Sequence, residues 1–235
     1  RKIWPYQLPN MDPEMLAKLV FCFENDPERS DGVISGAQDA LGICMPGLAR
    51  HYYDQRFWPV KIETCSDEKV LSWLEEHICL IPMFPRRPGC SVVEGKDITL
   101  PKVKALAKAA DDCWSAILDM DLDRFAAAYK ASFEAQVAMF PGMVNPTSTD
   151  GATTENPSSH IQKGIAQGDL TSAKSSEEEF LPSVQAYIDE YSRMPGVLAW
   201  KMPGAGGGGY LALVCTSRHT FPKGAIEITV RRGGM

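Results

Sequence analysis

Hydrophobic positions recur at helical spacing near the start of the chain and predict two helices there. Apolar residues at positions 16, 19, 20 and 23 follow Asp12 and Pro13, an N-cap residue and a proline at the first helical position, so we expect a helix over 13–25. The segment 35–45 is small and apolar except for one acid. It predicts a second helix that starts at Ser35-Gly36.

Strands and helices alternate through most of the remaining chain. Apolar runs bounded by turn residues predict strands over 58–63, 78–83, 197–202, 210–215 and 225–231. Helical periodicity predicts helices over 67–76, 101–118, 121–139 and 182–193, of which the middle two form a helical hairpin. This order predicts an α+β fold in which helices cover one face of an antiparallel sheet.

The segment 147–180 breaks this pattern. It is rich in serine and threonine and has almost no large apolar residue, so we expect a solvated loop or insertion.

A glycine-rich loop joins two of the predicted strands. Glycine occupies five of the six positions 204–209, with Ala205 as the exception. Gly204, Gly206 and Gly209 have the spacing of a dinucleotide fingerprint, but a strand follows instead of a helix, which excludes that motif. The loop could form an anion-binding nest, leave room for a ligand or a neighbouring backbone, or be a flexible hairpin connection.

Composition narrows the class of protein. The net charge of −6 and the isoelectric point near 5.3 argue against a nucleic-acid-binding surface. The seven cysteines lack Cys-x-x-Cys spacing and the four histidines lack metal-ligand spacing, so we expect reduced thiols and no zinc. No apolar run has the length of a membrane span and no signal peptide opens the chain, so the sequence predicts a soluble, cytoplasmic protein.

One acid is the first candidate for chemistry. Asp39 lies within an apolar stretch and follows Ser35, Gly36 and Gln38, where small residues and amides could meet a substrate hydroxyl. Glu24 could add a second carboxylate for a divalent cation. From the residues alone, a solvated helix face is the better explanation of each acid.

These motifs together resemble the GHMP small-molecule kinases, most closely the sugar kinases related to heptose-phosphate kinase, galactokinase and fucokinase. The resemblance rests on Glu24, the run Ser35-Gly36-Ala37-Gln38-Asp39-Ala40, Gly47, Trp58-Pro59 and the 204–210 loop. It implies that residues 1–75 are the end of the family's N-terminal domain. Residues 76–235 would then be its ferredoxin-like C-terminal domain, with the insertion at 147–180.

The resemblance also implies a reaction, the transfer of the γ-phosphate of ATP to a hydroxyl of a sugar or sugar phosphate. Asp39 would act on the acceptor hydroxyl, Glu24 would bind Mg²⁺, and the 204–209 loop would support the nucleotide. Ser35, Gly36 and Gln38 would line the acceptor site. Arg86 and Arg87 would face anionic groups of the acceptor, although a solvated turn explains them equally well.

The family's phosphate loop has no counterpart in this sequence, and the chain opens on Arg1. We therefore expect an incomplete chain, or one completed by a second chain. The alternative is a non-catalytic sugar-binding or regulatory protein on the same scaffold, and a decarboxylase of the diphosphomevalonate type is a third possibility.

Overall fold

The computed structural model describes residues 12–26, 28, 34–86, 90–92, 95–145, 147–148 and 183–233. Contacts divide the chain into two compact units, one up to Glu76 together with the residues from Ile228 onward, the other from His77 to Glu227. The sequence predicts the last residues as part of the second unit, whereas the contacts group them with the first. Arg87 and most of the predicted insertion at 147–180 lie outside the described residues.

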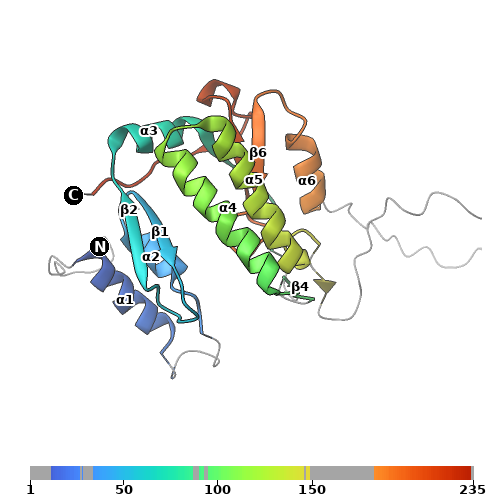
Figure 1. The fold of residues 1–235 in the computed structure, drawn as a ribbon. Coiled ribbons are helices and arrows are strands. Elements are labelled where there is room, and N and C mark those ends of the chain that lie inside the picture. Colours follow the sequence, from blue (N-terminus) through green and yellow to red (C-terminus); the bar gives the residue numbers. More distant parts are fainter. Residues whose placement is uncertain are drawn as a thin grey trace, which may run out of the picture. The chain divides into compact units, whose positions relative to one another are not determined.

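In its described residues, the first unit combines three helices with a hairpin of two strands (Figure 1). Its elements are α1 (Pro13–Glu24), α2 (Gln38–Cys44), β1 (Leu48–Tyr52), β2 (Lys61–Cys65) and α3 (Glu68–His77). The core of α1 and α2 consists of Ala17, Ala37, Leu41 and Cys44. Small side chains on both helices allow them to pack closely.

The start of α1 is as predicted, but the start of α2 is not. The Asp12 carboxylate accepts a hydrogen bond from the Met15 amide (3.1 Å), which confirms it as the N-cap. Helix α2 begins at Gln38, three positions after the expected Ser35. Ser35 does not cap the helix. Its backbone amide donates to the side chain of Asn25, which follows the end of α1 (2.7 Å).

The strands of the first unit also differ from expectation. β1 was not foreseen, and β2 begins at Lys61 instead of position 58. Trp58 contacts the ring of Phe21 edge-on, with centroids 5.7 Å apart. Its apolar character reflects packing on α1, and not a place in a strand.

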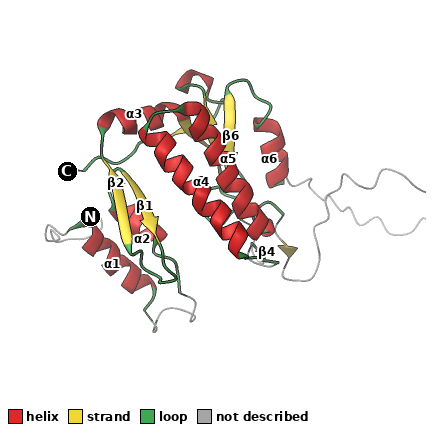
Figure 2. Cartoon of the chain, viewed as in Figure 1, coloured by secondary structure: helices red, strands yellow, loops and turns green. Residues whose placement is uncertain are grey.

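In its described residues, the second unit contains a four-stranded antiparallel sheet and helices. Its sheet has the order β6-β7-β3-β8, with β3 (Ile78–Pro82), β6 (Val197–Lys201), β7 (Tyr210–Cys215) and β8 (Ile226–Glu227). A short pair, β4 (Cys90–Ser91) and β5 (Thr147–Ser148), lies apart from it. The helices are α4 (Leu100–Leu118), α5 (Leu122–Met139) and α6 (Val184–Tyr191). Figure 2 shows strand β6 of this sheet beside helix α5. The predicted α+β class with antiparallel strands is confirmed.

Alternate residues of the central strands build the main core. Cys79 and Ile81 of β3 lie in one cluster with Leu211, Leu213 and Cys215 of β7. The same cluster contains Phe133 of α5 and Val184 and Ile188 of α6. Helices α5 and α6 therefore cover the same face of the sheet.

Asp121 accepts a hydrogen bond from the Arg124 amide (3.1 Å) and caps α5 as predicted.

The sequence predicts a strand over 225–231, but β8 ends at Glu227 and the chain after it does not continue the sheet. The Val230 amide instead donates to the Glu75 carboxylate of α3 (2.6 Å). The Arg232 guanidinium binds both Glu68 (Nη2 to Oε1, 2.6 Å) and Glu75 (Nη2 to Oε2, 3.2 Å). These charged contacts, which alternation of apolar residues cannot reveal, fix the C-terminal segment on α3.

Acid should weaken this attachment. Hydrogen bonds from Arg232 lower the pKa of the Glu68 and Glu75 carboxyls in the folded chain. Their contribution to stability is therefore present above the unfolded pKa of about 4.3 and is lost as the pH falls through the lower, folded values. We expect Arg232→Gln to flatten the fall in unfolding free energy between about pH 5 and pH 3. Urea titrations across this range measure it.

Arg56→Gln is the matched control, because Arg56 pairs with Asp54 (3.2 Å) at an exposed position of the same unit. A pH profile of the Arg232 variant parallel to that of the unaltered chain would show that the contacts with α3 add nothing to stability.

Candidate functional site

The glycine loop between β6 and β7 has a backbone that requires glycine. Gly204, Gly206, Gly207, Gly208 and Gly209 all have positive φ angles, between 69° and 144°. Residues with a Cβ rarely adopt these φ angles, so the backbone conformation of the loop requires the run of glycines.

The loop also packs tightly against other segments of the second unit. A Cβ on Gly206 would lie 2.9 Å from the Met143 Cβ, and one on Gly207 would lie 2.8 Å from a methyl group of Val92. A Cβ on Gly208 would lie 2.7 Å from the Phe84 carbonyl oxygen. Three of the glycines are therefore needed for close packing as well as for their φ angles.

Hydrogen bonds hold the middle of the loop and its end before β7. The Gly207 amide donates to the Met143 carbonyl, and the Gly209 amide donates to the Phe84 carbonyl, each at 2.8 Å. The Met83 amide returns a bond to the Gly209 carbonyl (2.8 Å). Of the alternatives that the sequence left open, close approach to a neighbouring backbone is the one observed. The amides of Gly207 and Gly209 are therefore directed into the protein.

Arg86 belongs to the same arrangement. Its Nε and Nη2 atoms donate to the Gly206 carbonyl at 3.1 and 2.9 Å. A planar guanidinium is suited to such a two-point contact. The resemblance predicts that Arg86 contacts anionic groups of the acceptor. In the structure, two of its guanidinium nitrogens bind the Gly206 carbonyl of the loop instead.

Asp39 lies in the first unit, in the first turn of α2, and is exposed. The buried positions of this helix are Ala40, Leu41 and Cys44, which follow helical spacing. Asp39 falls on the opposite face, so its apolar sequence neighbours do not bury it, contrary to the argument from sequence. Ser35, Gly36 and Gln38 are exposed as well. The carboxylate is thus open to a ligand from solvent.

Glu24, the last residue of α1, is also exposed. Burial raises the pKa of the Cys44 thiol, Arg231 lowers it, and Glu24 raises it further, which places Glu24 within electrostatic range of the end of α2. Among the described residues, no group of three or more His, Cys, Asp or Glu side chains could hold a metal ion. A Mg²⁺ ion would fit only in the manner usual for nucleotide complexes, with one or two carboxylates and the phosphates as ligands.

Arg231 is a feature that sequence reasoning missed. Its Nη1 donates to the Ile43 carbonyl (2.8 Å) and its Nη2 to the Cys44 carbonyl, at the C-terminus of α2. A cation at this end of a helix interacts favourably with the helix dipole. Because Arg231 lies almost two hundred positions away in the chain, no local pattern could have indicated the contact.

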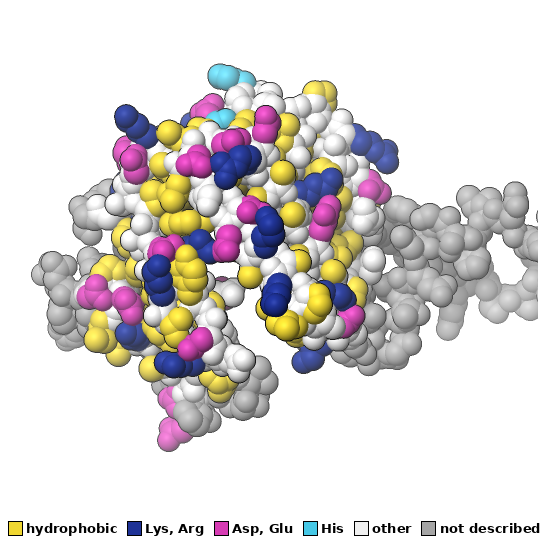
Figure 3. Space-filling model, in the orientation of Figure 1, with side chains coloured by type: hydrophobic (Ala, Val, Ile, Leu, Met, Phe, Trp, Pro, Cys, Tyr) yellow, Lys and Arg dark blue, Asp and Glu magenta, His cyan; other side chains and the backbone are white. Residues whose placement is uncertain are grey.

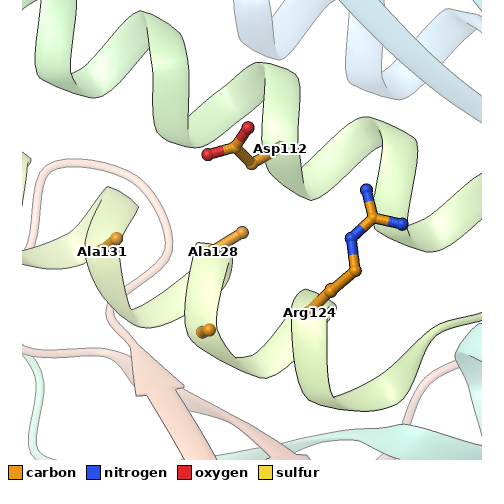
Figure 4. Close-up of a pocket in the computed structure, with 5 residues that line it drawn as sticks. Asp112, Arg124, Ala128 and Ala131 are labelled. Carbon is orange, nitrogen blue, oxygen red and sulfur yellow. The ribbon is translucent and has the colours of Figure 1, made fainter.

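A shallow groove lies between α4 and α5, far in sequence from both candidate motifs (Figure 4). Asp112 of α4 and Arg124, Ala127, Ala128 and Ala131 of α5 line it, and its volume is about 420 Å³. Both charged groups already have partners: Asp112 pairs with Lys108 (2.5 Å) and Arg124 with Asp119 (2.9 Å). We assign no chemistry to this groove.

The surface carries charges of both signs. On the face that Figure 3 shows, basic and acidic side chains are interspersed with apolar ones. Within the described part of the chain, no helix is both long and apolar enough to cross a membrane.

Comparison with known proteins gives a likeness in structure. No family model matches the chain, and no curated protein matches it. A crystal structure of a candidate sugar kinase from Campylobacter jejuni superposes on 95% of this chain with a TM-score of 0.53, at 15% sequence identity. This chain spans 57% of the length of that protein. At this identity the comparison shows a sugar kinase-like fold and nothing finer.

Proposed function

We propose that this protein is a phosphotransferase that transfers the γ-phosphate of ATP to a hydroxyl of a sugar or sugar phosphate. The observation that carries the proposal is the fold, which is similar to that of a candidate sugar kinase over nearly the whole chain. The motifs that resemble GHMP kinases, namely the run around Asp39 and the glycine loop before β7, support the same assignment independently.

In this proposal Asp39 acts on the acceptor hydroxyl, as a base or by orienting it. Its exposed carboxylate in the first turn of α2 meets the first requirement for that role, which is access to a substrate. Gln38, Ser35 and Gly36 would contact the acceptor beside it. Arg86 and Arg87 remain proposed contacts for anionic groups.

ATP and Mg²⁺ are the cofactors that the proposal requires. Phosphoryl transfer depends mainly on positioning and on stabilising negative charge, so a few carboxylates, a cation and directed amides are sufficient. Glu24 would be a Mg²⁺ ligand. Because the Gly207 and Gly209 amides are engaged within the protein, the loop 204–209 would support the nucleotide site by its shape, with the outer positions Gly204 and Ala205 exposed.

In family terms, the first unit would correspond to the end of the GHMP N-terminal domain and the second to its ferredoxin-like C-terminal domain. The antiparallel four-stranded sheet covered by α5 and α6 supports the second correspondence.

The engagement of the loop amides also favours a second candidate, a non-catalytic sugar-binding or regulatory protein on the same scaffold. Calorimetry on the product of the complete gene separates the two. The kinase proposal predicts binding of Mg²⁺-ATP at micromolar to millimolar concentration, in the range of ordinary enzyme substrates. Binding of a sugar without any binding of Mg²⁺-ATP would favour the non-catalytic protein.

A further inference from the structure

Helix α4 has more apolar surface than its packing against α5 uses. The two helices lie side by side in the second unit (Figure 1). The buried residues of α4 are Ala109 and Ala116, and Leu106 and Cys113 lie beside them on the same side of the helix. This side contains only part of the apolar residues of α4.

A second apolar stripe runs along the length of the same helix. Its members recur at alternating intervals of three and four residues and are Leu100, Val103, Ala107, Ala110, Trp114 and Ile117. Leu100 and Val103 are 66% and 43% exposed, and both alanines are exposed as well. Single exposed apolar residues are common on protein surfaces, but a continuous stripe indicates a contact surface. The alternating intervals are those of the seam between two helices of a coiled coil.

This stripe is complementary to itself when two copies of α4 run antiparallel. Its larger side chains lie toward the two ends and its alanines lie in the middle. The register that sets Ala107 beside Ala110 of a second copy also sets Val103 beside Trp114 of that copy, and the ends of the two stripes meet. Large side chains therefore pack on large ones, and the alanines allow the two helices to approach closely.

The charged residues beside the stripe fit the same register. Lys104 and Asp111 are exposed and flank the stripe on one side. In the antiparallel register, Lys104 of each copy lies beside Asp111 of the other, which gives two ion pairs of opposite charge. A parallel pair of helices would set Asp111 beside Leu106 of the second copy, where no ion pair forms. Charge complementarity therefore favours the antiparallel arrangement.

We propose that the chain forms a two-fold symmetric dimer in which the α4 helices of two copies pack antiparallel through this stripe. A two-fold axis brings the same surface of both subunits together, so a self-complementary surface is the kind that it requires. The proposed contact consists of α4 residues alone, and it does not depend on kinase activity.

The length of α4 determines how strong the dimer can be. The helix has 19 residues, so it is about 28 Å long and about 11 Å across, and one side of it covers close to 500 Å². Two copies would then bury about 1,000 Å² in total, which is near the lower limit for a specific interface. We therefore expect a reversible dimer with a dissociation constant in the micromolar range.

Sedimentation equilibrium of the unaltered chain between about 1 and 100 µM tests the proposal, because a dimer of this strength dissociates in that range. Ala107→Glu places a charge at the centre of the apolar contact and should weaken association by about tenfold or more. Ala105→Glu is the matched control, since Ala105 is an exposed alanine of the same helix that lies outside the stripe. This control should associate as strongly as the unaltered chain, and circular dichroism shows whether both variants fold.

A charge reversal tests the antiparallel register. Lys104→Glu brings like charges together in both symmetric pairs and should weaken the dimer by about threefold to tenfold. Lys104→Glu combined with Asp111→Lys should restore the association, because the two charges are then exchanged.

An unaltered chain that stays monomeric at about 100 µM overturns the proposal, and so does an assembly larger than a dimer. A dimer that a folded Ala107→Glu chain forms undiminished, or a charge reversal that the double variant does not rescue, contradicts it equally. If Ala107→Glu does not fold, the mass of the unaltered chain and the charge reversal decide.

Discussion

Gly206→Ala is expected to lower the free energy of unfolding by about 2 to 4 kcal/mol, which combines strain at a positive φ angle with overpacking. Gly206 has a φ of 76°, and a Cβ there would lie 2.9 Å from the Met143 Cβ and 3.0 Å from its backbone. Backbone atoms next to the short helix at 141–143 have little freedom to move away. Urea denaturation of the two proteins measures the difference.

Gly204→Ala is the matched control in the same loop. Gly204 has a similar φ of 69°, but nothing lies within 4 Å of its Cβ position. Gly204→Ala should lower the free energy of unfolding only by the strain of the positive φ angle, about 1 kcal/mol. Equal losses in the two variants would show that the loop does not pack as described, and that glycine is needed there for its backbone angles alone.

Asp39→Asn is expected to lower turnover by about 100-fold or more, the usual scale for loss of a positioned acid or base. Asparagine keeps the size of the side chain, and Asp39 is exposed in the first turn of α2, so folding should be preserved. Affinity for ATP should also be preserved, because the proposed role concerns the acceptor hydroxyl. Steady-state kinetics on the product of the complete gene, once an acceptor is known, give both quantities.

Asp54→Asn controls for the loss of one negative charge from the same unit, since Asp54 is an exposed acid that pairs with Arg56 (3.2 Å). It should turn over at the normal rate. If Asp39→Asn turns over as fast as Asp54→Asn, Asp39 is a solvated surface acid and the catalytic assignment is wrong.

Local patterns in the sequence predicted most helices of this fold correctly. Asp12 and Asp121 cap α1 and α5 as expected, since a cap depends on residues within one turn. The strands β3, β6 and β7 were also predicted, because each is a continuous apolar run. These features need no knowledge of distant parts of the chain.

The errors arose where residues outside the local segment decide the structure. β1 has no continuous apolar run, since its sequence is Leu-Ala-Arg-His-Tyr, and it was missed. Its pairing with β2 places Arg50 opposite Glu63 and Tyr52 opposite Lys61, and the Tyr52 hydroxyl donates to Glu63 (2.6 Å). The ion pairs of Arg232 likewise join positions more than 150 residues apart.

For the candidate site, the sequence identified the motifs but not the surroundings of their residues. It recognised that the glycines allow close approach, yet only the structure shows that Phe84, Val92 and Met143 are the partners. It singled out Asp39 as an acid in an apolar stretch, although the helical period leaves that position exposed.

Transfer of phosphate from γ-labelled ATP is the measurement that tests the proposed function most directly. The product of the complete gene is incubated with labelled ATP, Mg²⁺ and a panel of aldoses, ketoses and sugar phosphates, and labelled products are separated. The proposal predicts label on a hydroxyl of at least one acceptor, with one ADP formed per product and loss of transfer when Mg²⁺ is chelated. A folded protein that binds no ATP and labels no acceptor would contradict it.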